Sequence, residues 1–259
     1  MARVLITGSG QGLGFLAGQL LAQQGHRVVL HARNERRAAQ TCAALPTAED
    51  VLVGDLSSIA GMRSVAEQAN ASGRFDAVVH NAGVGFAERR ITTEDGLSHV
   101  FAINVLAPYV LTALITPPDR LVYLSSGMHE RGSADLSDPQ WRRRWFWRGR
   151  KAYADSKLFD VLLAFGVARA WPRVRSNALE PGWVPTRMGG RGATDDLRQG
   201  YLTQAWLAVS DDPATDVTGE YFFHQRLREP APAARDTEAQ EALLDYCAQL
   251  SRTPLPAIV

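Results

Sequence analysis

A tyrosine and a lysine stand four residues apart in the segment YADSK, as Tyr153 and Lys157. In a helix, positions i and i+4 share one face, so the phenol and the ammonium would lie side by side. An ammonium stabilises a phenolate and lowers the pKa of a phenol from its usual value of about 10. Tyr153 is therefore a candidate proton donor or acceptor, although such pairs also occur on protein surfaces.

A second candidate lies near the start of the chain, in the segment TGSGQGLG at residues 7–14. The apolar run ARVLI before it predicts a buried strand, and the spacing of apolar residues after it predicts an amphipathic helix. Free N–H groups at the start of such a helix favour an anion, and glycine lets a phosphate approach the backbone. A tight turn that binds nothing has the same pattern.

Strand and helix patterns alternate along the rest of the chain. Strands are predicted at 27–32, 51–55, 75–83, 120–126, 173–182 and 219–224, and helices at 34–44, 57–71, 95–115, 152–170 and 194–209. This alternation predicts an α/β protein with one doubly wound sheet of seven parallel strands, covered by helices on both faces. Ligands of such sheets bind beyond the carboxyl ends of the strands.

Asn104 falls on the apolar stripe of the predicted helix at 95–115, with Pro108 four residues later. Because proline has no N–H, it cannot donate to the Asn104 carbonyl. We expect a kink at this point, with a free carbonyl for which a bound water is the natural partner. A purely structural role for the buried amide is the alternative.

The bulk properties exclude several classes of protein. The chain has 259 residues and a formal net charge of +1, so no global field favours nucleic acid or a membrane surface. Cys42 and Cys247 lie far apart, without the spacing of a metal site or a disulfide framework. We expect no metal, and a cytoplasmic location, because no signal-peptide pattern is found. The basic and aromatic segment 141–151 is interpreted as a substrate-side wall or a subunit contact rather than a nucleic-acid or membrane site.

Five motifs follow one another in order: the glycine-rich turn, NAG at 81–83, SS at 125–126, the YxxxK pair and PG at 181–182. This order resembles the short-chain dehydrogenase/reductase family. Within it, the segments YLSSGMHERG, AYADSKLFDVLLAF and VRSNALEPGWVPT are most similar to retinol-dehydrogenase-like oxidoreductases. The resemblance covers nearly the whole chain. It implies a single-domain Rossmann fold over residues 1–259 that binds NAD(P).

The resemblance also implies a role for individual residues. Ser126, Tyr153 and Lys157 match the catalytic serine, tyrosine and lysine, whereas Ser125 is interpreted as structural. Asn104 matches an asparagine that holds a water linked to the lysine, and Tyr153 and Lys157 also contact the cofactor. The other residues that match cofactor-binding positions are Gly8, Ser9, Gln11, Gly12, Leu13 and Gly14 at the pyrophosphate, Asp55 and Leu56 at the adenine, Asn81, Ala82 and Gly83 along the ribose, and Pro181, Gly182, Val184 and Thr186 at the nicotinamide. His80 departs from the family's usual asparagine and is interpreted as a hydrogen-bonded core residue.

Together these matches predict an NADP(H)-dependent oxidoreductase that interconverts a carbonyl and an alcohol on a small organic substrate. The alternatives are a C=C reductase or biosynthetic tailoring reductase on the same scaffold, and a non-catalytic NADP(H)-binding sensor or scaffold protein. The insert at 127–151 and a C-terminal tail at 225–259 are expected to pack near the substrate side. The helices at 95–115 and 152–170 carry excess apolar surface, which predicts a homodimer or homotetramer.

Arg33 generates a prediction about cofactor choice. NAD enzymes of this type place an acid at the end of the second strand to bind the ribose 2′-OH, but this chain has Ala32 followed by Arg33. An arginine can pair with a 2′-phosphate, so we expect NADP(H) to be preferred, with NAD(H) as the alternative. Arg33→Ala should lose most of this preference. Steady-state kcat/KM with NADPH and NADH tests it, and equal or better kcat/KM with NADH in the unmodified protein would contradict it.

Overall fold

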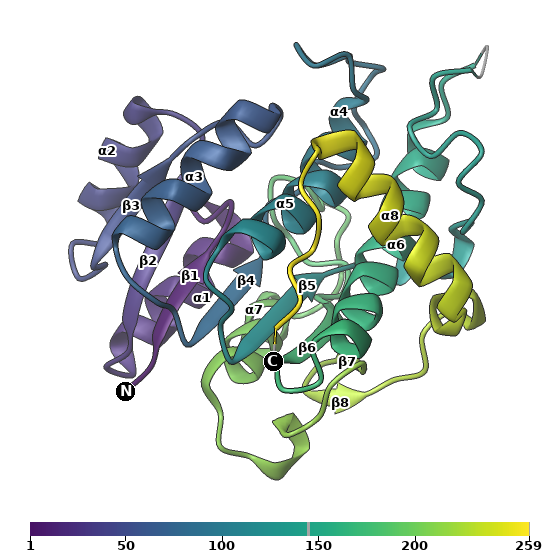
Figure 1. The fold of residues 1–259 in the computed structure, drawn as a ribbon. Helices are drawn as coiled ribbons and strands as arrows, with labels where there is room; N and C mark the ends of the chain where they lie inside the picture. Colours follow the sequence, from purple (N-terminus) through teal and green to yellow (C-terminus); the bar gives the residue numbers. More distant parts are fainter. Residues whose placement is uncertain (144–145, 259) are drawn as a thin grey trace.

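The computed structural model describes residues 1–143 and 146–258, which form one twisted sheet between two layers of helices (Figure 1). The strand order is β3-β2-β1-β4-β5-β6-β7-β8, so the order reverses between β1 and β4. The strands are β1 (Arg3–Ile6), β2 (Arg27–Ala32), β3 (Asp50–Val53), β4 (Ala77–His80), β5 (Arg120–Leu124), β6 (Arg175–Glu180), β7 (Tyr221–Phe223) and β8 (Arg226–Leu227).

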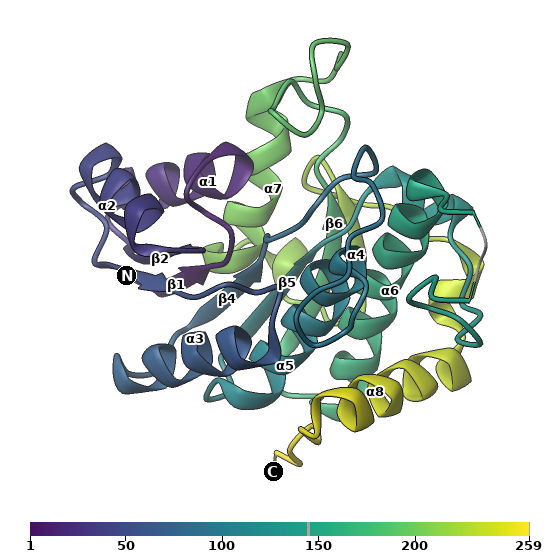
Figure 2. The ribbon, with the colours of Figure 1, turned by 90° about the horizontal axis from the view of Figure 1, so that it is seen from above.

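Helices cover both faces of the sheet, as the alternating pattern predicts (Figure 2). Side chains along β1 alternate between the two faces: Val4 and Ile6 join one core cluster, and Leu5 joins the other. One face carries α1 (Gly12–Gln23), α2 (Glu35–Ala44) and α7 (Leu197–Val209), and the other carries α3 (Ile59–Ala71), α5 (Ala107–Leu114) and α6 (Gly149–Ala170). The predicted doubly wound α/β fold is therefore confirmed. None of the helices in the described part of the chain is long and apolar enough to cross a membrane.

The sheet has one strand more than the seven that the sequence predicts. Strands β1 to β7 are parallel, and β8 pairs antiparallel with β7. His224 and Gln225 form the connection, with φ values of 48° and 61°. Two left-handed residues suit a two-residue hairpin turn, because their backbone twist matches that of the strands. The sequence gives no glycine or asparagine signal for this turn, so β8 was not expected.

The helix predicted at 95–115 is interrupted near Pro108. It consists of α4 (His99–Phe101), a π-helical turn (Ala102–Leu106) and α5. The ring nitrogen of Pro108 cannot donate to the carbonyl of Asn104, four residues earlier, so regular α-helical pairing fails here. The interruption lies where the sequence predicts a kink, and it puts Asn104 inside the π-helical turn.

The C-terminal segment contains a helix that the sequence analysis described only as a tail. Helix α8 (Thr237–Ser251) lies along α6, with Leu243 and Cys247 fully buried and Leu244 against Gly166. This packing helps to bury the apolar surface of α6, whose residues 152–168 are all buried within one chain. Thus α8 occupies the face on which the sequence-based prediction of a dimer rested.

The position of the tail also differs from the expectation that all of it packs near the substrate side. Its first part does approach the strand ends, because Arg228 pairs with Glu180 at the end of β6 and with Glu130. Helix α8 instead lies on the outer side of α6, away from the sheet (Figure 2). The apolar side chains of α8 need a core to pack against, and α6 and α5 provide it.

His80, at the end of β4, is a buried and hydrogen-bonded core residue. Its Nε2 lies 3.0 Å from Thr112 Oγ1, which in turn lies 2.7 Å from the Tyr123 hydroxyl. Nδ1 has no hydrogen-bond partner among the described residues. Burial lowers the pKa of His80 from 6.5 to about 3, because a charged imidazolium would lose its hydration there.

This shift predicts the effect of acid on stability. Between pH 6.5 and pH 3 the unfolded chain binds a proton at His80 that the folded chain does not, so stability is lost as the pH falls through this window. His80→Asn should make the pH dependence shallower by up to about 1.4 kcal/mol per pH unit, the value of one proton. Urea unfolding at several pH values from 7 to 4 measures this slope, and an unchanged slope would contradict the argument.

Candidate functional site

Tyr153 and Lys157 lie one turn apart on α6, beside the carboxyl end of β5. Both side chains are buried, and Lys157 Nζ lies 5.8 Å from the centre of the Tyr153 ring. Nζ donates a hydrogen bond of 2.7 Å to the carbonyl oxygen of Leu124, the last residue of β5. The tertiary structure thus holds the ammonium at the strand end, on the same side of α6 as the phenol.

The two serines after β5 make different contacts. Ser125 is buried, and its hydroxyl donates a 2.7 Å hydrogen bond to the main-chain carbonyl of Lys157. Ser126 is only partly buried, and its Oγ accepts a hydrogen bond from the Met128 amide at 3.3 Å. Ser125 therefore fastens α6 to β5, whereas the Ser126 hydroxyl can still donate to a bound molecule.

Asn104 uses its side chain to hold the segment that follows the NAG motif. Its Oδ1 accepts from the Val84 amide at 2.8 Å, and its Nδ2 donates to the Val84 carbonyl at 3.1 Å and to Ser156 Oγ at 3.0 Å. The amide is therefore satisfied by protein groups. The main-chain carbonyl of Asn104 cannot accept a hydrogen bond from Pro108, which has no N–H.

Asn104 and Lys157 both lie close to Gly83. A Cβ atom placed there would lie 3.5 Å from Asn104 Oδ1 and 3.7 Å from Lys157 Nζ. The chain between Asn81 and Gly83 thus passes directly beside the lysine. The structure brings Asn104, Lys157 and the NAG segment together from three parts of the sequence.

The glycine-rich turn is fitted closely against the NAG segment. Gly8 has a φ of +62°, and a Cβ there would lie 2.6 Å from the Ala82 Cα atom. A Cβ on Gly14 would lie 2.3 Å from Asn81 Nδ2, which donates to the carbonyls of Thr7 and Gly8 at 2.9 and 3.2 Å. Gly8 and Gly14 are therefore needed for this approach of two loops.

The start of α1 can accept an anion. No side chain caps this helix at Gln11, whereas Asn34 and Ser58 cap α2 and α3. Gly12 has a φ of +67°, and nothing lies within 4 Å of the position of a Cβ atom on it. Among the described residues, the first amides of α1 thus have no side-chain partner, and they lie beside an open backbone, which fits the pyrophosphate of a dinucleotide.

The side chain of Ser9 has a different role from that of its glycine neighbours. It is fully buried, and its hydroxyl donates to the Ile6 carbonyl at 2.6 Å and accepts from the His31 amide at 2.8 Å. Ser9 thus joins the ends of β1 and β2, so it shapes the turn from inside the protein.

The residues matched to the adenosine part surround the ends of β2 and β3. Arg33 is exposed directly after β2 and, within the described ranges, makes no hydrogen bond or ion pair. Asp55 is also exposed, and its Oδ1 accepts from the Ser57 amide at 2.9 Å, while Leu56 is buried. A phosphate near Arg33 would meet an unpaired guanidinium.

His31 links these two regions, and sequence reasoning missed it. Its Nδ1 accepts from the Gly8 amide at 3.0 Å, so Nε2 carries the proton and donates to the Gly54 carbonyl at 2.9 Å. Burial lowers the pKa of His31, which keeps the ring neutral and able to accept. Its position as the penultimate residue of a predicted strand gave no signal of this contact.

The loop after β6 contains the residues matched to the nicotinamide. It begins with Pro181 and Gly182, whose φ is +81°, and the carboxylate of Asp195 accepts from the amide of Trp183 at 2.7 Å. Val184 is buried: a Cβ on Gly200 of α7 would lie 2.9 Å from Val184 Cγ1 and 3.2 Å from Leu13 Cδ2.

Leu13 and Val184 thus meet at α7, although 171 residue positions separate them in the sequence numbering. Thr186 closes the loop, because its hydroxyl oxygen accepts from the Gly189 amide at 3.1 Å. The structure therefore places the loop after β6 next to the glycine-rich turn.

His129 positions the turn that contains Ser126, and the sequence analysis did not select it. Its Nε2 accepts from the Ala231 amide at 3.0 Å, so Nδ1 donates to the Ser126 carbonyl at 2.8 Å. The two hydrogen bonds connect the segment after β8 with Ser126, the second residue after β5. A single histidine next to a serine pair is too weak a pattern to predict such a contact.

The insert packs around Phe86, the residue that lies against Tyr153. The Phe86 ring lies edge-on to the Tyr153 ring with 6.0 Å between their centres, and the Arg150 guanidinium lies 4.8 Å above Phe86. Trp141 Nε1 donates to Asp155 of α6, and Trp147 Nε1 donates to the Glu88 carbonyl. Two other members of the basic, aromatic cluster, Arg144 and Trp145, lie outside the described residues.

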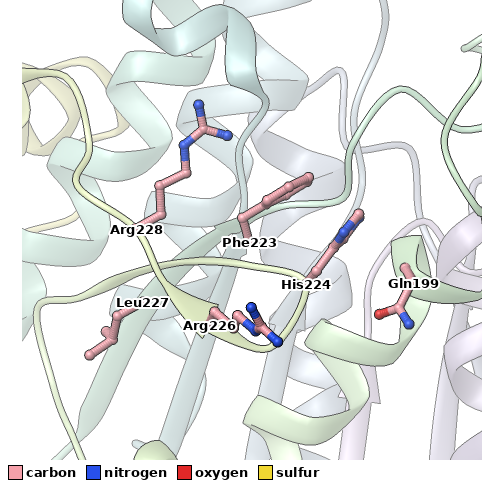
Figure 3. Close-up of a pocket in the computed structure, with 6 residues that line it drawn as sticks. All are labelled: Gln199, Phe223, His224, Arg226, Leu227 and Arg228. Atoms are coloured by element: carbon pink, nitrogen blue, oxygen red, sulfur yellow. The ribbon is translucent and has the colours of Figure 1, made fainter.

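A cavity of about 590 Å³ lies at the β7–β8 hairpin and the start of α7 (Figure 3). Figure 3 shows Arg228 and Phe223 projecting to one side, with His224 nearer to Gln199 of α7. None of the residues that line it belongs to the group around Tyr153. Within residues 1–143 and 146–258, no group of three or more His, Cys, Asp or Glu side chains could hold a metal ion.

Comparison with known proteins agrees with this arrangement. The family model described as short chain dehydrogenase matches residues 2–130. A short-chain dehydrogenase of Penicillium rubens is 39% identical, covering 99% of this chain and all of its own length. An uncharacterized oxidoreductase of Emericella nidulans is 41% identical and covers 99% of both chains. Human retinol dehydrogenase 13 is 28% identical and covers 98% of this chain and 86% of its own.

Solved structures show the same fold. An uncharacterized protein from Mycobacterium Paratuberculosis superposes with a TM-score of 0.84 at 26% identity, covering 99% of this chain and 95% of its own. A blue fluorescent protein from a metagenomic library, solved in complex with NADPH, superposes with a TM-score of 0.68 at 23% identity, covering 85% and 95%.

Gly14 provides a test of the close contact between the two loops. Gly14→Ala should displace Asn81 from the carbonyls of Thr7 and Gly8, and NADPH affinity should fall by about tenfold or more, as overpacking of 1–3 kcal/mol implies. Gly18→Ala is the matched control, because its methyl group would press on the flexible end of Leu30, away from the loops. Titration of NADPH fluorescence measures both affinities. Equal losses in the two variants would contradict a specific effect at Asn81.

Proposed function

Because the chain belongs to the short-chain dehydrogenase/reductase family, we propose that it transfers a hydride between NADP(H) and the carbonyl or alcohol carbon of a small organic substrate. The observation that supports this most directly is the placement of Tyr153 and Lys157 on α6 at the carboxyl end of β5, the strand that Ser126 follows in the chain. Lys157 lies beside Gly83, where the NAG segment passes from the glycine-rich turn. The family membership makes the protein an oxidoreductase that binds a nicotinamide cofactor.

In the proposed reduction, each residue has a separate task. The Ser126 hydroxyl donates a hydrogen bond to the carbonyl oxygen of the substrate and stabilises the charge that develops there. The Tyr153 hydroxyl donates the proton that this oxygen takes up, and the Lys157 ammonium stabilises the phenolate that remains. The nicotinamide, when bound, supplies the hydride. Oxidation of the alcohol runs through the same groups in the opposite direction.

Lys157 and Asn104 also connect the phenol with the rest of the site. The remaining N–H of Lys157 can donate to a ribose hydroxyl next to Gly83. The main-chain carbonyl of Asn104 cannot accept a hydrogen bond from Pro108, which has no N–H. This carbonyl is the group proposed to hold a water for proton exchange with solvent.

NADP(H) is the proposed cofactor because of Arg33. Its exposed guanidinium follows β2 directly, without an acid in position to bind a ribose 2′-OH. The solved neighbour in complex with NADPH has the same fold at 23% identity. NAD(H) is the alternative cofactor, and a comparison of kcat/KM with NADPH and with NADH decides between the two.

The proposed substrate is a ketone or aldehyde with an apolar body. Phe86 stands against Tyr153, and the nearby loop after β6 presents Trp183 and Met188, both about half exposed. A Streptomyces protein provisionally named daunorubicin C-13 ketoreductase DnrU is 32% identical and covers 86% of this chain and 83% of its own, which favours carbonyl reduction over C=C reduction. A sensor that binds the cofactor without turnover would not need Ser126, Tyr153 and Lys157 together.

We also propose an oligomeric state and a cellular location. The proposed assembly is a homodimer or homotetramer, and because α8 packs on α6, its interface is proposed to lie on another surface. Light scattering at micromolar concentration determines the state. Cys42 is exposed and Cys247 is buried, and neither forms a disulfide, which fits the proposed cytoplasmic location.

Tyr153→Phe tests the proposed acid. The variant keeps the ring and its packing against Phe86 but removes the only group of Tyr153 that can supply a proton. Turnover should fall by roughly 10²–10⁴ or more, the contribution of a positioned acid or base, while NADPH affinity stays close to that of the unmodified protein. Lys157→Ala should weaken both NADPH binding and turnover, because it removes a ribose contact as well as a charge. Steady-state rates on a panel of carbonyl substrates, with NADPH titrations, separate the two effects.

Because the two residues act together, the double variant should be little worse than the poorer single variant. Near-normal turnover by Tyr153→Phe on a true substrate would show that Tyr153 is not the acid. NADPH binding without turnover of any carbonyl by the unmodified protein would favour the sensor.

A further inference from the structure

A buried carboxyl group beside Lys157 has no task in the proposed mechanism. Asp160 lies on α6, three residues after Lys157, and is 2% exposed. Its Oδ2 accepts a hydrogen bond from Lys157 Nζ at 2.8 Å, and both side chains of this ion pair are almost completely buried. Two charges removed from water in this way carry a cost that a surface pair does not.

The hydrogen bonds of Lys157 show what the carboxylate contributes to the site. An ammonium has three N–H donors. One donates to the Leu124 carbonyl at 2.7 Å and a second to Asp160, and Nζ also lies 3.7 Å from the position of a Cβ on Gly83. One donor therefore remains for a ligand at the NAG segment. Asp160 and Leu124 together fix the ammonium beside Gly83, where its third N–H can donate to a bound ligand.

The charges around Lys157 oppose one another. Burial by itself disfavours the ammonium and lowers the pKa of Lys157, but the negative charge of Asp160 next to it, with Tyr153, raises that pKa above its ordinary value. Burial raises the pKa of Asp160 to about 7, although the Lys157 ammonium favours its ionised form. Of the two groups, Lys157 is favoured more strongly in its charged form, because at alkaline pH the Asp160 carboxylate is ionised and available as its counter-ion.

Two titratable groups of the neighbouring strands, Tyr123 and His80, are uncharged. Tyr123 of β5 lies near Asp160, and burial raises the pKa of its phenol. His80 of β4 stacks on Tyr123 with 4.7 Å between ring centres, and its pKa of about 3 leaves it neutral. Asn104, from the π-helical turn, is an amide. Among the described residues, Asp160 is thus the carboxylate that is hydrogen-bonded to Lys157.

We propose that Asp160 is a positioning residue: it is the counter-ion that keeps Lys157 protonated and fixed in a buried position, so that the lysine can bind the cofactor ribose at alkaline pH. This inference rests on the proposed function, in which Lys157 contacts the ribose. Without the carboxylate, the buried lysine would lose its proton at a lower pH. The remaining amine would then be a weaker donor to the ribose hydroxyl and could not stabilise a phenolate.

The experiment is the pH dependence of NADPH binding to Asp160→Asn. Asparagine has nearly the same shape and keeps an oxygen acceptor, but it has no charge. NADPH affinity is measured by fluorescence titration at pH 7.5 and pH 9.5, both above the second pKa of a phosphate monoester, about 6. Between these values the unmodified protein should keep its affinity. The variant should lose about tenfold, the lower end of the contribution of a hydrogen bond to a charged group.

Two further variants identify the cause. Asp155→Asn is the matched control: Asp155 is a buried carboxyl on the same helix, but it pairs with Lys151 and Trp141 instead of Lys157. Its NADPH affinity should not acquire a pH dependence. In Lys157→Arg/Asp160→Asn the guanidinium stays charged at pH 9.5, so the alkaline loss should disappear, whatever the affinity at pH 7.5. Asp160→Ser, which is smaller and also neutral, gives the same expectation if asparagine prevents folding.

The outcomes separate this inference from the proposed function. An Asp160→Asn variant whose affinity follows that of the unmodified protein at both pH values would overturn the role of Asp160. So would an alkaline loss that persists in the double variant with arginine. An unmodified protein that binds neither NADPH nor NADH would instead overturn the proposed function, and with it this inference. The binding measurement needs no substrate, so it does not depend on finding the true one.

Discussion

The site depends on the attachment of α6 to the carboxyl end of β5. Two hydrogen bonds of 2.7 Å run in opposite directions across this contact: Lys157 Nζ donates to the Leu124 carbonyl, and Ser125 Oγ donates to the Lys157 carbonyl. They fix the rotation of α6 as well as its distance from the strand. Tyr153, one turn earlier on the helix, is thereby held on the side where Ser126 leaves the sheet. The buried charge of Lys157 makes this attachment costly to form without a counter-ion.

A second attachment joins the two loops on either side of the point where the strand order reverses. Asn81 holds the carbonyls of Thr7 and Gly8, and His31 accepts from the amide of Gly8 while it donates to Gly54. The backbone of the glycine-rich turn is thus fixed from both sides. A backbone that is ordered before a ligand arrives has less conformational entropy to lose on binding. This explains why side chains that touch no ligand occupy such buried positions.

Helix α8 covers apolar surface of α5 and α6, the large helices on the second face of the sheet. Because residues 152–168 of α6 are buried within one chain, with α8 packed along it and the end of β5 hydrogen-bonded to it, its apolar surface does not require a second subunit. The excess of apolar residues at 95–115 and 152–170 is real, but the partner that covers it is in the same chain. The composition of a helix indicates how much apolar surface must be buried, but it does not indicate whether the same chain or a second subunit buries it.

The sequence by itself determined the α/β alternation, the seven parallel strands and the positions of the five motifs at strand ends. These features rest on local patterns: the period of apolar residues, the glycines of a turn, and a tyrosine and a lysine on one helix face. Even the interruption near Asn104 followed from a single proline.

The tertiary structure alone decided the contacts between segments that are distant in the chain. His31 with Gly8, His129 with Ala231 and α8 with α6 join residues that no local pattern relates. Asp160 is the most telling case, because its spacing from Lys157 was plain in the sequence. A carboxylate three residues from a lysine is an ordinary surface pair when it is solvated. Only the packing of α6 against β5 removes the water and turns it into the counter-ion of a buried charge.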